Sequence, residues 1–173
     1  MEKEAVKMPQ TDVLSFHLQE TEEDTLKGKY LLFSIENEMY GMEIRYITEI
    51  IGIQPITGVY GMPAYVKGVM NLRGKIIPVI DARLRFKKAV REYDDRTCII
   101  VTDTNDISIG LVVDTVSEVI SIQNEDIAPL PDINNDGRGY IKGIGKAGGD
   151  IMLLLDCQRL LSDKELEALS IIH

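Results

Sequence analysis

The chain has 173 residues, of which 45% are hydrophobic and 27% charged, and its formal net charge is −9. This length suits one domain, or two small ones, and the composition excludes an intrinsically disordered chain. No apolar run reaches the roughly 18 residues of a membrane-spanning helix, and the N-terminal residues lack the apolar stretch of a signal peptide. The acidic pI argues against nucleic acid as a partner, because phosphate binding needs clustered Lys and Arg. We therefore expect a soluble, cytoplasmic protein.

Residues 1–28 are predicted to form an acidic, flexible leader. They hold seven acidic residues and three lysines. The most acidic stretch, Thr21–Thr25, has the composition of a solvated, mobile segment. Residues 29–173 are predicted to form the folded part of the chain.

Short runs rich in β-branched residues begin at Lys29, with Gly, Asn, Asp or Pro between most of them. This pattern is typical of a largely antiparallel all-β barrel or sandwich. The predicted strands are Tyr30–Ile35, Met39–Met42, Ile76–Ile80, Cys98–Val101, Ile107–Val113, Val116–Ile122 and Ile151–Leu155.

Two parts of the chain repeat each other. A shift of 75 residues places Tyr65–Val69 on Tyr140–Ile144. A shift of 69 places Gly41–Ile53 on Gly110–Ile122. The two shifts differ by six, which predicts a six-residue insertion within Asp126–Gly139 of the second copy. Such a duplication predicts two similar units, each closed as a small barrel.

The repeats set the expected domain organisation. The first repeat covers about residues 29–90 and the second about 91–161, although the sequence leaves open whether the barrels exchange strands. A C-terminal helix is predicted at about 162–169, because Ser162 and Glu165 have the spacing of a capping box.

Cysteine and histidine usage limits the possible chemistry. Cys98 and Cys157 are isolated within apolar runs, which predicts buried free thiols. His17 lies in the leader and His173 is the last residue, so the chain has almost no material for a histidine triad or a zinc site. We expect no catalytic residues, no cofactor and no metal site.

Three motifs nevertheless have functional alternatives. Gly143–Gly148 fits GxGxxG, but a strand follows it where a nucleotide site needs a helix, so we interpret it as part of a strand–turn–strand unit. Asp132–Gly137 resembles half of a calcium loop, but Gly143 stands where a bidentate Glu is required. Asp81 and Asp156 could act as paired acids, yet each precedes a helical-looking run and is predicted to be an N-cap. An enzyme and a calcium- or ligand-binding β module remain alternatives.

The first repeat alone carries Asn71–Gly74, where the second has Lys146–Gly149. An arginine in a tight turn projects its guanidinium outward, and Arg is a favoured anchor at protein interfaces. Glu49 has a counterpart in Glu118, whereas Arg73 has none. This asymmetry is expected when one duplicated unit is specialised for a partner. The alternative is an ordinary solvated arginine.

The run Val66–Asp81, containing KGVMNLRGKIIPVID, resembles the CheW family of bacterial chemotaxis coupling proteins. Tyr30–Phe33, Met39–Met42, Ile47–Ile50 and Ile109–Val119 also fit the family. The similarity covers the chain from about Gly28 to Leu169. It implies an all-β fold of two SH3-like five-stranded β-barrels around a shared core, with a short C-terminal helix and no catalysis.

The resemblance also implies partners. Such proteins are adaptors that couple the cytoplasmic tips of methyl-accepting chemotaxis receptors to the regulatory domain of the histidine kinase CheA. The kinase contacts the first barrel and the receptor tip packs between the barrels, with Glu49 paired to Arg73. The expected partner-binding residues are Glu49, Arg73, Ile47, Ile50, Asn71, Met62, Ala64 and Tyr65.

We further expect a protein that is monomeric when free and is recruited to receptor arrays at the inner face of the membrane. Nucleic-acid binding and direct membrane insertion are not expected. A CheW-like scaffold for a non-chemotactic kinase pathway is a closer alternative than an enzyme or a calcium module.

Overall fold

The structure is a computed structural model that describes residues 25–104, 107–130 and 139–170. Most of the predicted leader, residues 1–24, and the whole calcium-like loop, residues 132–137, therefore lie outside the described residues. The strands are β1 (Lys29–Ile35), β2 (Glu38–Glu43), β3 (Ile47–Gly52), β4 (Val66–Leu72), β5 (Lys75–Asp81), β6 (Cys98–Thr104), β7 (Ile107–Val113), β8 (Thr115–Ser121), β9 (Ile127–Ala128), β10 (Ile141–Ala147) and β11 (Asp150–Leu155). The helices are η1 (Ile44–Tyr46), α4 (Ala82–Arg85), η2 (Asn124–Asp126), η3 (Cys157–Arg159) and α5 (Asp163–Ser170).

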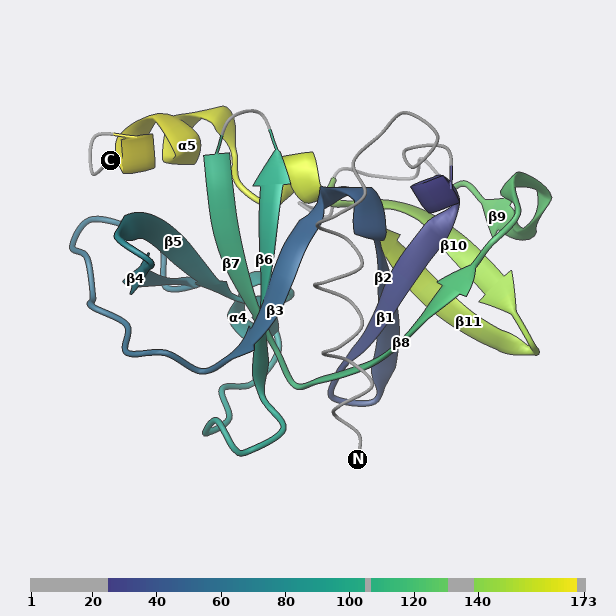
Figure 1. Cartoon of the computed structure of the whole chain (residues 1–173), viewed down its shortest axis with the longest axis horizontal. Coiled ribbons are helices and arrows are strands. Elements are labelled where there is room, and N and C mark those ends of the chain that lie inside the picture. Colours follow the sequence, from purple (N-terminus) through teal and green to yellow (C-terminus); the bar gives the residue numbers. More distant parts are fainter. Residues whose placement is uncertain (1–24, 105–106, 131–138, 171–173) are drawn as a thin grey trace.

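The described strands form two sheets, which lie side by side in Figure 1. One has five strands in the order β3-β6-β7-β5-β4, and we call it the five-stranded barrel. The other has six in the order β8-β1-β2-β11-β10-β9, and we call it the six-stranded barrel. The predicted all-β class with two barrels and a short C-terminal helix is confirmed. One sheet exceeds the expected five strands because it includes the two-residue strand β9.

Each sheet is closed by the segment that follows its first edge strand. In the six-stranded barrel the chain leaves β8, and β9 then pairs with β10. In the five-stranded barrel the chain leaves β3, and Thr57 forms a single bridge with Val69 of β4. Gly68, beside this bridge, has a φ of +145°, and a Cβ there would collide with the Thr57 carbonyl. Glycine is therefore required for this closure.

The two repeats exchange hairpins. The β1–β2 hairpin of the first repeat lies in the six-stranded barrel, and the β6–β7 hairpin of the second repeat lies in the five-stranded barrel. The registers are equivalent, because Leu32 pairs with Gly41 in one hairpin and Val101 pairs with Gly110 in the other. A boundary near residue 90 thus separates the sequence repeats but not the barrels.

The core has three parts. The largest lies between the barrels and takes side chains from both, including Phe33, Ile80 and Leu111. A smaller cluster fills each barrel, one around Met70 and the other around Met152. Alternation along the strands produces this arrangement, because successive residues of a strand point to the shared core and to the barrel interior in turn.

The predicted helix caps are confirmed. The Asp81 carboxylate accepts hydrogen bonds from the backbone N–H groups of Arg83 and Leu84, and that of Asp156 accepts from Gln158 N–H. At α5, the Glu165 N–H donates to Ser162 Oγ and the Ser162 N–H donates to the Glu165 carboxylate.

The two cysteines differ in burial. Both are free thiols, as predicted. Cys157 is buried, and burial raises the pKa of its thiol to about 12. Cys98 is only partly buried, so the expectation of a buried thiol holds for Cys157 alone.

Candidate partner-binding site

Glu49 and Arg73 meet at one end of the five-stranded barrel. Arg73 Nη1 donates to Glu49 Oε2 at 2.5 Å and Nη2 donates to Oε1 at 2.8 Å. Glu49 lies on β3 and Arg73 lies in the turn after β4, and these strands are the two edges of the sheet. The bidentate ion pair therefore spans the closure of the barrel.

Arg73 sits in a two-residue hairpin turn that disfavours its residue type. Its φ is 55° and that of Gly74 is 84°, so both central residues have the left-handed conformation of a type I′ turn. The corresponding turn in the second repeat uses Gly148 and Gly149, with φ values of 59° and 85°. A non-glycine residue held in such a conformation is a reason to suspect function.

Asn71 fixes this turn from its base. Its Oδ1 accepts a hydrogen bond of 2.8 Å from the Gly74 N–H. This local hydrogen bond stabilises the left-handed backbone conformation of Arg73, which a glycine would adopt without strain. Asn71 therefore orients Arg73, a role that differs from direct contact with a partner.

The ion pair is exposed on the arginine side only. The Arg73 side chain is 70% exposed and the Glu49 side chain 17%. Hydrogen bonding to Glu49 raises the pKa of the Arg73 guanidinium above its usual value, so the cation is permanent. A guanidinium has five N–H donors, and the two bonds to Glu49 leave others for an acceptor on a partner. This arrangement suits recognition of a carboxylate or a carbonyl.

The other predicted site residues lie elsewhere. Ile47 is 8% exposed and belongs to the core between the barrels, where Ile50 also packs. Met62 and Tyr65 precede β4 and pack against the same core, and Ala64 is exposed. Strand β4 separates these loop residues from the turn at Arg73 by roughly 20 Å. The structure thus joins Glu49, Arg73 and Asn71, while the role of the remaining residues stays a prediction.

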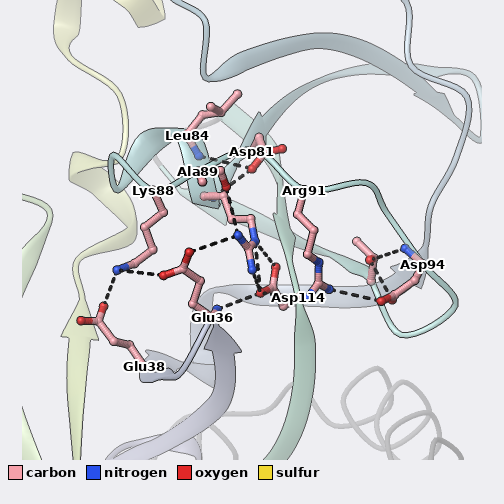
Figure 2. A network of polar contacts seen from close by, with 11 residues as sticks. Glu36, Glu38, Asp81, Leu84, Lys88, Ala89, Arg91, Asp94 and Asp114 are labelled. Atoms are coloured by element: carbon pink, nitrogen blue, oxygen red, sulfur yellow. Dashed lines mark hydrogen bonds and ion pairs between the residues drawn. The ribbon is translucent and has the colours of Figure 1, made fainter.

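A buried ion pair that no sequence pattern indicated lies where the chain crosses from one barrel to the other. Arg83 Nε donates to Asp114 Oδ1 at 2.9 Å and Nη2 donates to Oδ2 at 2.8 Å, with side-chain exposures of 10% and 11%. Asp114 also accepts from the Glu36 N–H at 2.8 Å. Figure 2 shows Glu36 and Arg91 approaching Asp114 from different parts of the chain. No short-range spacing links these residues, which explains why sequence reasoning missed them.

The remaining motifs have structural explanations where the structure describes them. Gly143–Gly148 belongs to β10 and its turn into β11, which confirms the strand–turn–strand interpretation. Across the described ranges, no group of three or more His, Cys, Asp or Glu side chains could hold a metal ion. No helix in those ranges is long and apolar enough to span a membrane.

The fold and this surface define a class of protein: a duplicated two-barrel β module with a rigidly presented arginine at one barrel rim. Comparison with known proteins gives the family. The CheW-like domain family matches residues 29–165. The chain is 37% identical over 144 residues to the chemotaxis protein CheW of Klebsiella aerogenes, covering 83% of this chain and 87% of that protein.

Other relatives agree. The chain is 33% identical to the chemotaxis protein CheW of Treponema pallidum, covering 80% of this chain and 84% of that one. The crystal structure of the scaffolding protein TtCheW from Thermoanaerobacter tengcongensis superposes with a TM-score of 0.70 at 34% identity, covering 74% of this chain and 88% of that one. This chain belongs to the CheW family of non-catalytic chemotaxis adaptors.

Proposed function

We propose that this protein couples chemoreceptor cytoplasmic tips to the histidine kinase CheA, with the five-stranded barrel contacting the kinase regulatory domain through Arg73. Family membership supports the adaptor role. The observation that carries the site is the bidentate Glu49–Arg73 pair, which holds an exposed guanidinium on a strained turn. Asn71 orients the turn, and the receptor tip packs in the groove between the barrels.

The protein acts in the cytoplasm at receptor arrays and is monomeric when free. Its loop residues Met62, Ala64 and Tyr65 extend the binding surface, and Ile47 and Ile50 support it from the core. Chemotaxis is favoured over a non-chemotactic kinase pathway because the CheW relatives at 30% identity or more are described as chemotaxis proteins or probable ones.

The test is an NMR titration of the ¹⁵N-labelled protein with an isolated CheA regulatory domain. We expect saturable shifts of amides in β3 and in the β4–β5 turn, including Glu49, Asn71 and Arg73. The β10–β11 turn of the second repeat, Gly148–Gly149, serves as the internal control and should remain unshifted. Saturable shifts confined to the six-stranded barrel, or none at high micromolar partner, would contradict the proposed kinase face.

A further inference from the structure

The short helix α4 lies at the junction of the two barrels, and its last residue, Arg85, crosses that junction. The Arg85 guanidinium carbon lies 4.8 Å from the ring centroid of Tyr65 and 4.6 Å from that of Tyr140. Tyr65 leads into β4 of the five-stranded barrel, and Tyr140 leads into β10 of the six-stranded barrel. One guanidinium plane therefore contacts an aromatic ring from each barrel.

A directional hydrogen bond accompanies these ring contacts. Arg85 Nε donates to the carbonyl oxygen of Leu160 at 2.7 Å. Leu160 follows η3, which comes after β11 of the six-stranded barrel, and its side chain is fully buried in the shared core. Arg85 follows β5 of the five-stranded barrel. Two of its contacts, with Tyr140 before β10 and with Leu160 after β11, are with residues next to strands of the six-stranded barrel.

The repeat explains why these groups meet. Tyr65 and Tyr140 are separated by 75 residues, and so are Arg85 and Leu160. Both tyrosine carbonyls accept equivalent bonds, from Asp81 N–H at 2.8 Å and from Asp156 N–H at 2.7 Å. The cluster therefore joins counterpart positions of the two repeats. One repeat supplies the arginine and the other supplies the carbonyl that accepts from it.

Each tyrosine is held firmly by its surroundings. Tyr140 is 3% exposed and stacks on Phe86 with centroids 4.9 Å apart. The Tyr65 hydroxyl donates to the Glu165 carboxylate of α5. Burial, and then this hydrogen bond, raises the pKa of Tyr65 to about 12, so the hydroxyl remains a donor at physiological pH. A guanidinium between two fixed rings has little rotational freedom.

We propose that Arg85 is the positioning residue that fixes the orientation of one barrel relative to the other. The apolar core between the barrels supplies cohesion, but hydrophobic burial is non-directional. The contacts with the two rings and the Nε–H···O bond supply the direction. A lysine could not reproduce them, because its ammonium has neither a plane nor a fixed fork of donors. The consequence that two partners are held at a set angle rests on the proposed adaptor function.

The test compares Arg85→Lys and Arg85→Gln with the wild-type protein, and uses Arg96→Lys, at an exposed arginine, as the matched control. Residual dipolar couplings are measured for amides of β1–β2 and of β6–β7, which lie in different barrels. For the wild type and the control, both sets should fit one alignment tensor. For both Arg85 variants, the two sets should require tensors that differ in magnitude or direction beyond the fitting error. A single tensor for a folded Arg85 variant would overturn the proposal.

A second variant guards against misfolding. Tyr65→Leu removes one face of the stack from a partly exposed position and should separate the two tensors in the same way. If it leaves a single tensor, the proposal is equally overturned. A purely stabilising role would lower the melting temperature of the variants without splitting the tensors.

The couplings need no partner. They therefore test the role of Arg85 even if the wild-type protein does not bind the kinase domain. Failure of the wild-type protein to bind would refute the proposed function and not the role of Arg85.

Discussion

Gly68 and Gly143 are counterparts in the two repeats, yet the space for a Cβ atom beside the neighbouring carbonyl differs greatly between them. A Cβ built on Gly68 would lie 1.9 Å from the Thr57 oxygen, whereas one on Gly143 would lie 3.1 Å from the Ala128 oxygen. Of these two glycines, Gly68 has a positive φ and Gly143 does not. The closure of the five-stranded barrel therefore excludes a side chain at Gly68, whereas the closure of the other barrel leaves nearly enough room for one at Gly143.

Gly68→Ala should destabilise the protein far more than Gly143→Ala. We expect a loss of at least about 3 kcal/mol for the first, because both the backbone conformation and the space exclude a methyl group, and about 1 kcal/mol for the second. Urea unfolding followed by circular dichroism measures both. Equal losses would show that Gly68 does not hold the left-handed conformation against Thr57 in solution.

Arg73→Ala and Arg73→Gly should weaken binding of the CheA regulatory domain by about tenfold or more, as expected for an arginine anchor. Neither should lower the melting temperature appreciably, and the glycine variant relieves the left-handed strain. Isothermal titration calorimetry and thermal unfolding provide the two readouts, with Arg96→Ala as the exposed control. Aggregation, or loss of the melting transition, would make Arg73 structural and refute its assignment as a binding residue.

The Arg83–Asp114 pair predicts a pH-dependent stability. Burial alone would raise the pKa of Asp114, but its bonds with Arg83 and with the Glu36 N–H outweigh this and lower the pKa below its usual range. The folded state therefore binds the proton less readily than the unfolded chain. The resulting stability is present above about pH 4 and is lost as the pH falls further.

Asp114→Asn should remove this contribution. At pH 7 the variant should lose about 3 kcal/mol, because the buried Arg83 guanidinium loses its bidentate anion and keeps only the longer ion pair with Glu36 at 3.3 Å. Between pH 5 and pH 3 its free energy of unfolding should fall less than that of the wild type. Urea titrations at several pH values measure the slope, and parallel pH profiles for the two proteins would contradict the assignment.

The capping box predicts a local effect at α5. Ser162→Ala should reduce the stability of this helix by about 1 kcal/mol, because the Glu165 N–H loses its acceptor. Ser162→Asp retains an acceptor and serves as the conservative control. Amide hydrogen exchange across Asp163–Ser170 should be faster in the alanine variant only, and unchanged exchange there would show that tertiary contacts alone hold the helix.

Some features follow from neighbours in the chain, and the sequence predicts them well. The Ser162–Glu165 box and the Asp81 cap depend on side chains and N–H groups only two or three residues apart. The duplication is equally readable, because matched spacing survives in Tyr65–Val69 and Tyr140–Ile144. The pairing of Glu49 with Arg73 came from the resemblance to CheW, since 24 residues separate them and no local rule connects them.

Alternation, turn residues and repeats are local properties, and they suffice to predict a duplicated all-β protein with an asymmetric arginine turn. Folding of the whole chain selects the partner of each strand, places Ile47 in the shared core and brings Arg83 to Asp114 where the chain crosses between barrels. The alternation of residues along a strand shows which residues share a face but does not indicate which other strands pair with it. Ladder hydrogen bonds and buried ion pairs join residues distant in the chain, so their partners are chosen by packing of the whole molecule.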